Sequence, residues 1–267
     1  MAETSRKTRS APAAPGSLRR AGPAATIAAG ARDLDAGATG RGESSARAYE
    51  QLRQMIVWGR LAPGSRVVEA EISERLGVSR TPARSAIHRL QQEGYVTLGE
   101  RSKERRLIVA PLTQDDAREL FEIVGQLEGL AARGAAALDR ARRTPVVQRL
   151  RRLNAELSSA AKQRRPDPMG IFDLDMAFHR CYVEAGAGPR LLGLHDATKP
   201  QAERYVRLYI TSLIDEIATS VEEHNVIVRA IEAGDPPAAQ QAVDANWRNA
   251  ARRLSRVIES LGERGSW

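Results

Sequence analysis

The stretch LGVSRTPARSAIHRL, from Leu76 to Leu90, decides the fold of the N-terminal part of this chain. Gly77 is expected to end one helical segment, because glycine readily adopts the left-handed conformation that terminates a helix. Thr81 and Pro82 then begin a second helix, with Thr81 as its cap and Pro82 at the first helical position. The segment therefore predicts two helices that are joined by a tight turn.

The second helix has two contrasting faces. Its apolar residues recur at helical spacing and should point inward: Ala83, Ala86, Ile87 and Leu90. The opposite face carries hydroxyl and cationic side chains that can donate hydrogen bonds to guanine edges or reach phosphate oxygens. The candidate DNA-binding residues of this face and its N-terminus are Ser79, Arg80, Thr81, Arg84, Ser85 and His88.

The flanking segments complete a winged helix-turn-helix. A preceding helix has its apolar residues on one face, namely Tyr49, Leu52, Met55 and Ile56. After the second helix, YVTL and RLIVA are two β-prone runs separated by GERSKER, which predicts a small two-stranded wing. We assign this module to residues 44–112. The alternative interpretation is an ordinary helical hairpin with exposed arginines.

Composition and charge agree with a DNA-binding end. The chain has 267 residues and a net charge of +8, and residues 1–113 hold the whole basic excess. Residues 1–43 are rich in Ala, Gly, Pro, Arg and Ser without a sustained period, which predicts a disordered tail. A single cysteine excludes an intrachain disulfide, and no apolar run is long enough for a membrane span. We expect a cytoplasmic protein that has no membrane partner.

The remainder of the chain is expected to be entirely helical. Proline, glycine and aspartate signals divide it into helices at 114–140, 145–164, 168–185, 188–211, 214–233 and 235–262. The predicted fold class is therefore mainly α, with the winged module followed by a bundle of about six helices at 113–262. Residues 263–267 are expected to be a short tail.

Polar residues interrupt the apolar faces of three of these helices. Asp175 and His179 lie four residues apart on one face, and His224 and Asn246 lie among aliphatic residues of later helices. A buried carboxylate needs a partner, because leaving it unpaired costs several kcal/mol. The four residues are a candidate site for one divalent metal ion, and the alternative is a hydrogen-bonded core without metal.

The N-terminal module resembles the GntR family of bacterial transcription regulators over residues 46–112. The similarity lies in G-x-L-x-PG, followed by E-x-x-x-x-x-x-LGVSRTP-x-R. The resemblance implies that Ser79, Arg80, Thr81 and Arg84 contact operator DNA and that the wing tip enters the minor groove. This wing reads GERSKERR where the family often has an RRG-like turn, and its candidate contacts are Arg101, Lys103, Arg105 and Arg106.

The helices at about 114–260 resemble the FadR-type effector-binding domain of one GntR subfamily. D-x-x-x-H at Asp175 and His179, and EH-x-x-I-x-x-AI-x-x-GD from Glu223 to Asp235, are similar to the metal motif of that domain. The resemblance implies zinc, nickel or a similar ion, although Asn246 stands where metal-binding members usually have His. Val124 stands where many relatives have an Arg that holds an organic-acid effector. The candidate substitutes are Tyr205, Tyr209 and Arg253.

Together these features predict a homodimeric transcriptional regulator that is not an enzyme. Its operator affinity would be modulated by a small metabolite, an organic acid or a related compound, and the resemblance implies repression more often than activation. One alternative is a DNA-binding regulator without effector response. Another is a metal-dependent enzyme fused to a DNA-binding module.

Overall fold

The computed structural model describes residues 32–99 and 106–265. Helix α1 runs from Arg32 to Val57 and so begins well before residue 44, where we expected the winged module to begin. No proline occurs between Arg32 and the turn at Pro63, so nothing in this segment blocks helical hydrogen bonding. Residues 32–43 are thus helical rather than part of a tail, and residues 1–31 of the predicted tail lie outside the described residues.

The predicted pair of helices follows as α2 (Glu69–Leu76) and α3 (Arg80–Gln92). Gly77 ends α2 in the left-handed conformation, with φ of 63°. Helix α3 begins two residues earlier than predicted, with Ser79 rather than Thr81 as the residue before its first turn. Ser79 is extended, with φ of −69° and ψ of 166°, which is the usual backbone of an N-cap position.

The predicted wing is present as the strands β1 (Val96–Leu98) and β2 (Leu107–Val109). They pair antiparallel, with Val96 opposite Val109 and Leu98 opposite Leu107. Val96 and Val109 join a buried cluster to which the inner face of α3 also contributes. This shared core fixes the orientation of α3 and leaves its other face exposed.

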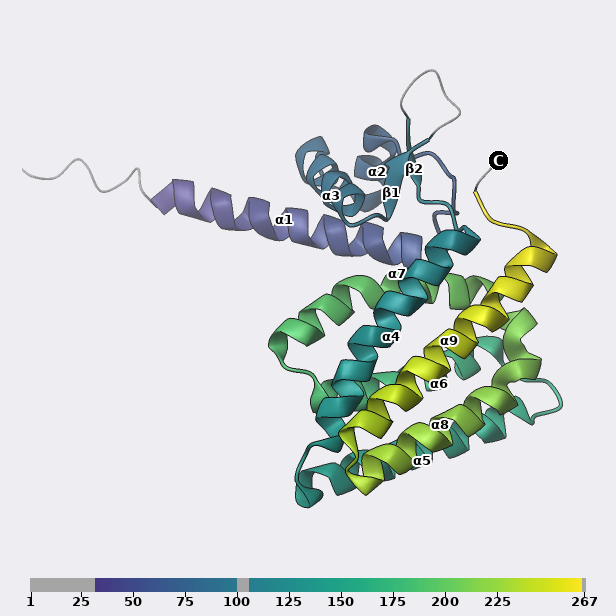
Figure 1. Ribbon diagram of the computed structural model, residues 1–267. Coiled ribbons are helices and arrows are strands. Elements are labelled where there is room, and N and C mark those ends of the chain that lie inside the picture. The colour runs from purple at the N-terminus through teal and green to yellow at the C-terminus, as the bar shows by residue number, and fades with distance from the viewer. Residues whose placement is uncertain (1–31, 100–105, 266–267) are drawn as a thin grey trace, which may run out of the picture. The chain divides into compact units, whose positions relative to one another are not determined.

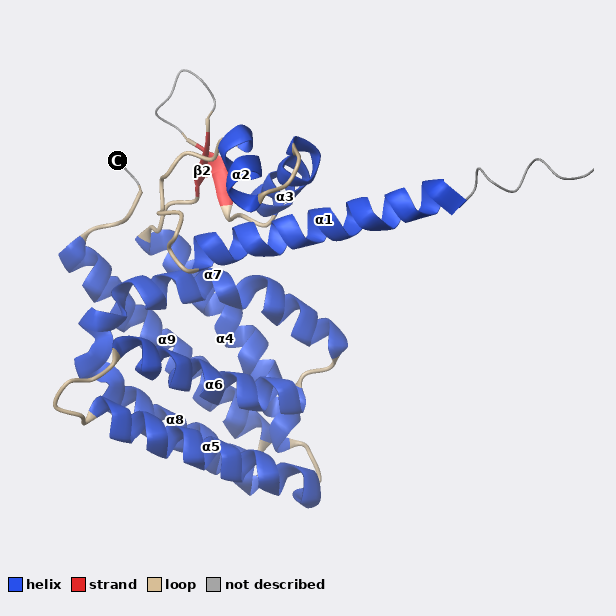
Figure 2. Cartoon of the chain, turned by 180° about the vertical axis from the view of Figure 1, so that it is seen from behind, coloured by secondary structure: helices blue, strands red, loops and turns tan. Residues whose placement is uncertain are grey.

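Six α-helices lie between Gln114 and Leu261 (Figure 1). They are α4 (Gln114–Ala136), α5 (Arg140–Ala161), α6 (Pro168–Gly186), α7 (Pro189–Leu213), α8 (Ile217–Ala233) and α9 (Pro236–Leu261), and a short 3₁₀ turn, η1 (Ile214–Glu216), joins α7 to α8. This confirms the expected all-helical second domain. Within the part of the chain that the structure describes, Figure 2 shows β-strand only in the wing.

Helix α4 is central in the bundle because it packs against α6, α7, α8 and α9. Its buried face is rich in alanine and glycine, which lets neighbouring backbones approach closely. At Gly186, the last residue of α6, an added Cβ would lie only 2.0 Å from the carbonyl oxygen of Ala131. The contact between α4 and α6 therefore requires a residue without a side chain.

The C-terminus differs from the tail that we expected at 263–267. Arg264 forms an isolated antiparallel bridge with Leu112, with two backbone hydrogen bonds of 2.8 and 3.1 Å. These bonds satisfy peptide groups beside the start of α4 and hold the end of the chain there. Residues 266–267 lie outside the described residues. None of the described helices is apolar and long enough to cross a bilayer.

Replacing Gly186 with alanine should destabilise the protein by about 1–3 kcal/mol, because the new methyl group forces the backbones of α4 and α6 apart. Gly193 of α7 is the matched control, since a Cβ there meets nothing within 4 Å. Gly193→Ala should be neutral or stabilise by up to about 1 kcal/mol through its higher helix propensity. Urea denaturation of both variants measures this difference, and equal stabilities would contradict it.

Candidate functional site

The outward face of α3 is exposed, as the sequence predicted. Ser79, Arg80, Thr81, Ser85 and His88 are all exposed. Arg84 has 74% of its side chain exposed, and its guanidinium donates to both carboxylate oxygens of Glu69 on α2, at 2.8 and 3.0 Å. This ion pair lies on the surface, so Arg84 can exchange Glu69 for another anionic partner at small cost. Of the predicted wing contacts, Arg101, Lys103 and Arg105 lie outside the described residues.

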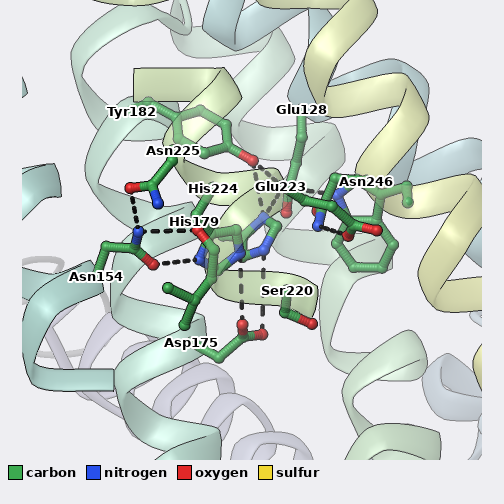
Figure 3. A network of polar contacts seen from close by, with 12 residues as sticks. Glu128, Asn154, Asp175, His179, Tyr182, Ser220, Glu223, His224, Asn225 and Asn246 are labelled. Atoms are coloured by element: carbon green, nitrogen blue, oxygen red, sulfur yellow. Dashed lines mark hydrogen bonds and ion pairs between the residues drawn. The ribbon is translucent and has the colours of Figure 1, made fainter. Parts of the chain in front are cut away.

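Three of the four predicted metal-site residues converge in the helical domain. The ligand atoms of Asp175 and His179 on α6 and of His224 on α8 all lie within 4.8 Å of one another (Figure 3). His224 Nε2 is 3.6 Å from Asp175 Oδ1, and His179 Nε2 is 4.0 Å from Asp175 Oδ2. Both imidazoles therefore present the same ring nitrogen to one carboxylate.

Hydrogen bonds on the far side of each ring fix this orientation. His179 Nδ1 donates to Glu128 Oε2 at 2.6 Å, and His224 Nδ1 donates to Asn154 Oδ1 at 3.1 Å. The amide nitrogen of Asn154 donates to Val221 O and to Asn225 Oδ1, which leaves its carbonyl oxygen for the imidazole. Both Nε2 atoms consequently carry free lone pairs, as metal-binding histidines with such partners do.

Glu128 on α4 is the centre of the surrounding network and is completely buried. Its Oε1 accepts from Lys199 Nζ at 2.9 Å and from His195 Nε2 at 3.1 Å. Its Oε2 accepts from His179, from the Tyr182 hydroxyl at 2.6 Å and from the Trp247 indole at 2.9 Å. The carboxylate thus connects α4 with α6, α7 and α9.

Burial and neighbouring charges shift the pKa values of this cluster. Burial raises the pKa of Glu128, but the charge of Lys199 and the bonds from the histidines outweigh it and hold that pKa well below its usual value. Burial above all, with the charge of Arg253, lowers the pKa of His224 well below its usual value, so its ring is neutral. Burial raises the pKa of Asp175, which a nearby cation would reverse.

Asn246, the fourth predicted metal-site residue, has another partner. Its amide nitrogen donates to Glu223 Oε2 at 2.8 Å. Glu223 also accepts from Asn249 at 2.7 Å and from the Arg253 guanidinium at 2.9 and 3.1 Å. Burial raises the pKa of Glu223, but these donors outweigh it, and the pKa is lowered. Arg253 also donates to Ser220 at 3.2 Å, so its charge is already paired.

A cavity of about 70 Å³ adjoins the cluster and is lined by Asp175, His179, Asn246 and Arg253. Two of the predicted effector residues, Tyr205 and Tyr209, do not line it. The Tyr205 hydroxyl donates to Asp116, and the Tyr209 hydroxyl donates to Gly262 O at 2.9 Å. Both tyrosines satisfy groups near the ends of α4 and α9, because the helical phase of α7 places their hydroxyls there. Only Arg253 of the three lies at the cavity.

Sequence reasoning missed several members of the network. Glu128 lies on the apolar face of α4 together with Phe121, Val124 and Ala131, and this pattern could have identified it. Lys199 and His195 could not be placed from the sequence, because Pro200 disturbs the helical phase of α7 around them. Asn154 gives little signal, since one Asn among charged residues looks like part of an exposed surface.

Replacing Glu128 with glutamine should destabilise the domain by about 3–5 kcal/mol, because Lys199 is left buried without a counter-charge. Glu119, exposed on the same helix, supplies the control, and Glu119→Gln should change stability by less than about 0.5 kcal/mol. Chemical denaturation gives both values. A Glu128→Gln variant as stable as the wild type would contradict the charged state assigned to this carboxylate.

Two family models match the chain. The model described as "Bacterial regulatory proteins, gntR family" matches residues 44–102, and the "FCD domain" model matches residues 119–249. The first covers the winged helix-turn-helix, and the second covers the helices that form the polar cluster. Both resemblances that the sequence motifs indicated are therefore confirmed.

Individual relatives agree. The chain is 34% identical to an HTH-type transcriptional regulator from the TAR-I ttuE-ttuC' intergenic region of Agrobacterium vitis, over 52% of this chain and 79% of that protein. It is 30% identical to the "Probable D-xylose utilization operon transcriptional repressor" of Paenarthrobacter nicotinovorans, over 72% of this chain and 82% of that protein. The solved structure of E. coli McbR/YncC shares the fold, with a TM-score of 0.60 at 17% identity over 80% of this chain and 97% of that chain. The chain therefore belongs to the GntR family of bacterial transcriptional regulators, with a DNA-binding winged helix-turn-helix and a C-terminal FCD domain.

Proposed function

We propose that the chain is a repressor whose affinity for operator DNA is set by a small organic-acid effector bound next to a divalent metal ion. The observation that carries the proposal is the convergence of one carboxylate and two imidazole Nε2 atoms beside a cavity. This site lies in the domain that follows the DNA-binding module. Repression is supported by the similarity to the probable D-xylose utilization operon repressor of Paenarthrobacter nicotinovorans.

The residues fit a divalent cation. His224 Nε2 is buried and has no hydrogen-bond partner, which is costly unless another group satisfies it. Imidazole nitrogen with carboxylate oxygen suits zinc or nickel. Asp175, His179 and His224 would hold the ion, and Asn246 offers a carbonyl oxygen as a weaker fourth ligand. Once bound, the ion supplies positive charge that attracts an anionic effector.

We further propose that two copies bind a two-fold operator. Ile123 and Leu130 are 41% and 48% exposed on the outer face of α4, and a second copy could cover this apolar surface. The effector changes operator affinity only if it binds one arrangement of the two DNA-binding domains better than the other. Ser79, Arg80, Thr81, Arg84, Ser85 and His88 are the proposed DNA contacts on each copy.

Removal of the metal should lower the melting temperature. At a metal concentration 100-fold above its dissociation constant, binding contributes about 2.7 kcal/mol, so chelation should lower the melting temperature by about 5–10 °C. The double variant Asp175→Ala with His179→Ala should lose the ion, as measured by elemental analysis. His88→Ala is the control, because His88 is an exposed histidine on α3.

The metal content of these proteins, together with the response of operator binding to organic acids, distinguishes the proposed function from a regulator without effector response. Near-stoichiometric metal in the wild type and in His88→Ala, but not in the double variant, supports the proposed site. If the wild type carries no metal and operator binding responds to no organic acid, the chain is a DNA-binding regulator without effector response. Metal retained in the double variant would contradict the ligand assignment.

Arg84→Ala should weaken specific operator binding by about 1–3 kcal/mol, because a paired contact to a base edge or phosphate is lost. The operator would first be selected from a random DNA library. Arg133→Ala removes the same charge from an exposed position on α4 and controls for net charge. Gel-shift titration at fixed salt compares the two variants, with light scattering to verify unchanged mass. Equal affinities would contradict the role of Arg84.

A further inference from the structure

We propose that the effector is a short-chain monocarboxylate with a hydrocarbon body, bound in the cavity beside Asp175 and His179. This inference rests on the proposed function, because it names the ligand class of the same site. Three properties of the cavity lead to it. They are the chemistry of its wall, its volume and the pairing of its charges.

Most of the cavity wall is hydrocarbon. Beyond the polar side at Asp175 and Asn246, apolar side chains come from α4, α7, α8 and α9, and they include Phe121, Val206, Ile210, Leu213, Ile217 and Leu254. Asn246 and Leu254 are separated by about 12 Å of rise along α9. A ligand whose head reaches the polar centre must therefore place its body against these side chains. Ser220, Glu216 and Arg253 also line the cavity, but each is already hydrogen-bonded or ion-paired, so hydroxyl groups on that body would lose hydrogen bonds to water and compete for occupied partners.

The volume limits the size of the body. The cavity measures about 70 Å³, which is roughly half of the ~150 Å³ apolar cavity that is known to accommodate benzene. A hydrocarbon body of about three or four carbon atoms fits this space without movement of the wall. A hexose acid or a long acyl chain is larger than this space and would have to extend beyond it.

The charges favour a single carboxylate. Arg253 is the one permanently charged cation among the lining residues, all of which the structure describes, and Glu223 already neutralises it. Glu216 is paired with Arg256 at 3.0 Å. The remaining charged group is Asp175. A divalent ion held by this carboxylate and two neutral imidazoles therefore has a net charge of +1. A monocarboxylate balances this charge, whereas a dicarboxylate leaves an unpaired anion in an apolar space.

The test is calorimetric titration of the zinc- or nickel-loaded full-length protein with isovalerate, glycerate and malonate. These acids have equal numbers of non-hydrogen atoms but differ in hydroxyl groups and charge. Isovalerate should bind at least about tenfold more tightly than either of the others. Along the series acetate, propionate and butyrate, each methylene should tighten binding about fourfold.

A matched pair of variants tests the location. Ala250 lines the cavity, whereas Ala251 lines a separate cleft between α4 and α9, and both are partly buried against the same core. Ala250→Leu fills part of the cavity and should weaken isovalerate binding at least about tenfold, while metal content stays unchanged. Ala251→Leu adds the same bulk and should leave binding unaffected. If Ala250→Leu does not fold, titration of the wild type with the series of acids still tests the ligand class.

The outcomes separate this inference from the proposed function. Tighter binding of glycerate or malonate than of isovalerate would overturn the ligand class and leave a metal-dependent effector site in place. Stoichiometric metal with no binding of any of these acids would likewise overturn the ligand class alone. Absence of metal together with absence of acid binding would overturn both.

Discussion

The helical domain depends on one buried carboxylate. Glu128 has no exposed surface, and burial of an isolated charge is far too costly for a folded domain unless partners compensate it. Its partners come from three other helices: Tyr182 and His179 from α6, Lys199 and His195 from α7, and Trp247 from α9. Because each oxygen accepts several donors, movement of any of these helices relative to α4 breaks charge-assisted bonds. This requirement determines both the packing and the direction of the His179 ring.

The hydrogen bond from His179 to Glu128 connects the packing of the helices with the chemistry of the site. Since His179 Nδ1 donates to Glu128, its Nε2 is left for a ligand, and Asn154 does the same for His224. Without Glu128 and Asn154 as partners, both imidazole rings could rotate and form hydrogen bonds with other groups. Glu223 has a comparable role on α9, where it holds Asn246 and Arg253 in place. The groups that face the cavity are therefore fixed in advance by residues behind them.

The sequence predicted most of the fold and about half of this site. Periodicity identified α3 and its exposed face, and spacing placed Asp175 and His179 on one side of α6, because both signals are local to a single helix. Convergence between helices is not local, so neither the partner of His224 nor the five donors of Glu128 could be read from spacing. Tyr205 and Tyr209 illustrate a second difficulty. Polar aromatic residues on a buried face were assigned to a pocket, but they satisfy backbone and side-chain groups at the ends of helices.

The distribution of polar and apolar contacts also limits how a ligand can act. The polar side chains are already held by hydrogen bonds on the side that faces away from the cavity. They therefore have little freedom to take different positions in two arrangements of the domain. The apolar wall is different, because Leu213, Glu216 and Ile217 lie at η1, where α7 gives way to α8 through a 3₁₀ turn. Dispersion contacts there vary gradually with position, and short 3₁₀ segments often mark places where helices move. A ligand that discriminates between two arrangements must obtain its differential affinity from whichever surface changes. In this domain the apolar contacts at η1 are less constrained by hydrogen bonds than His179 and His224, whose rings Glu128 and Asn154 hold in place.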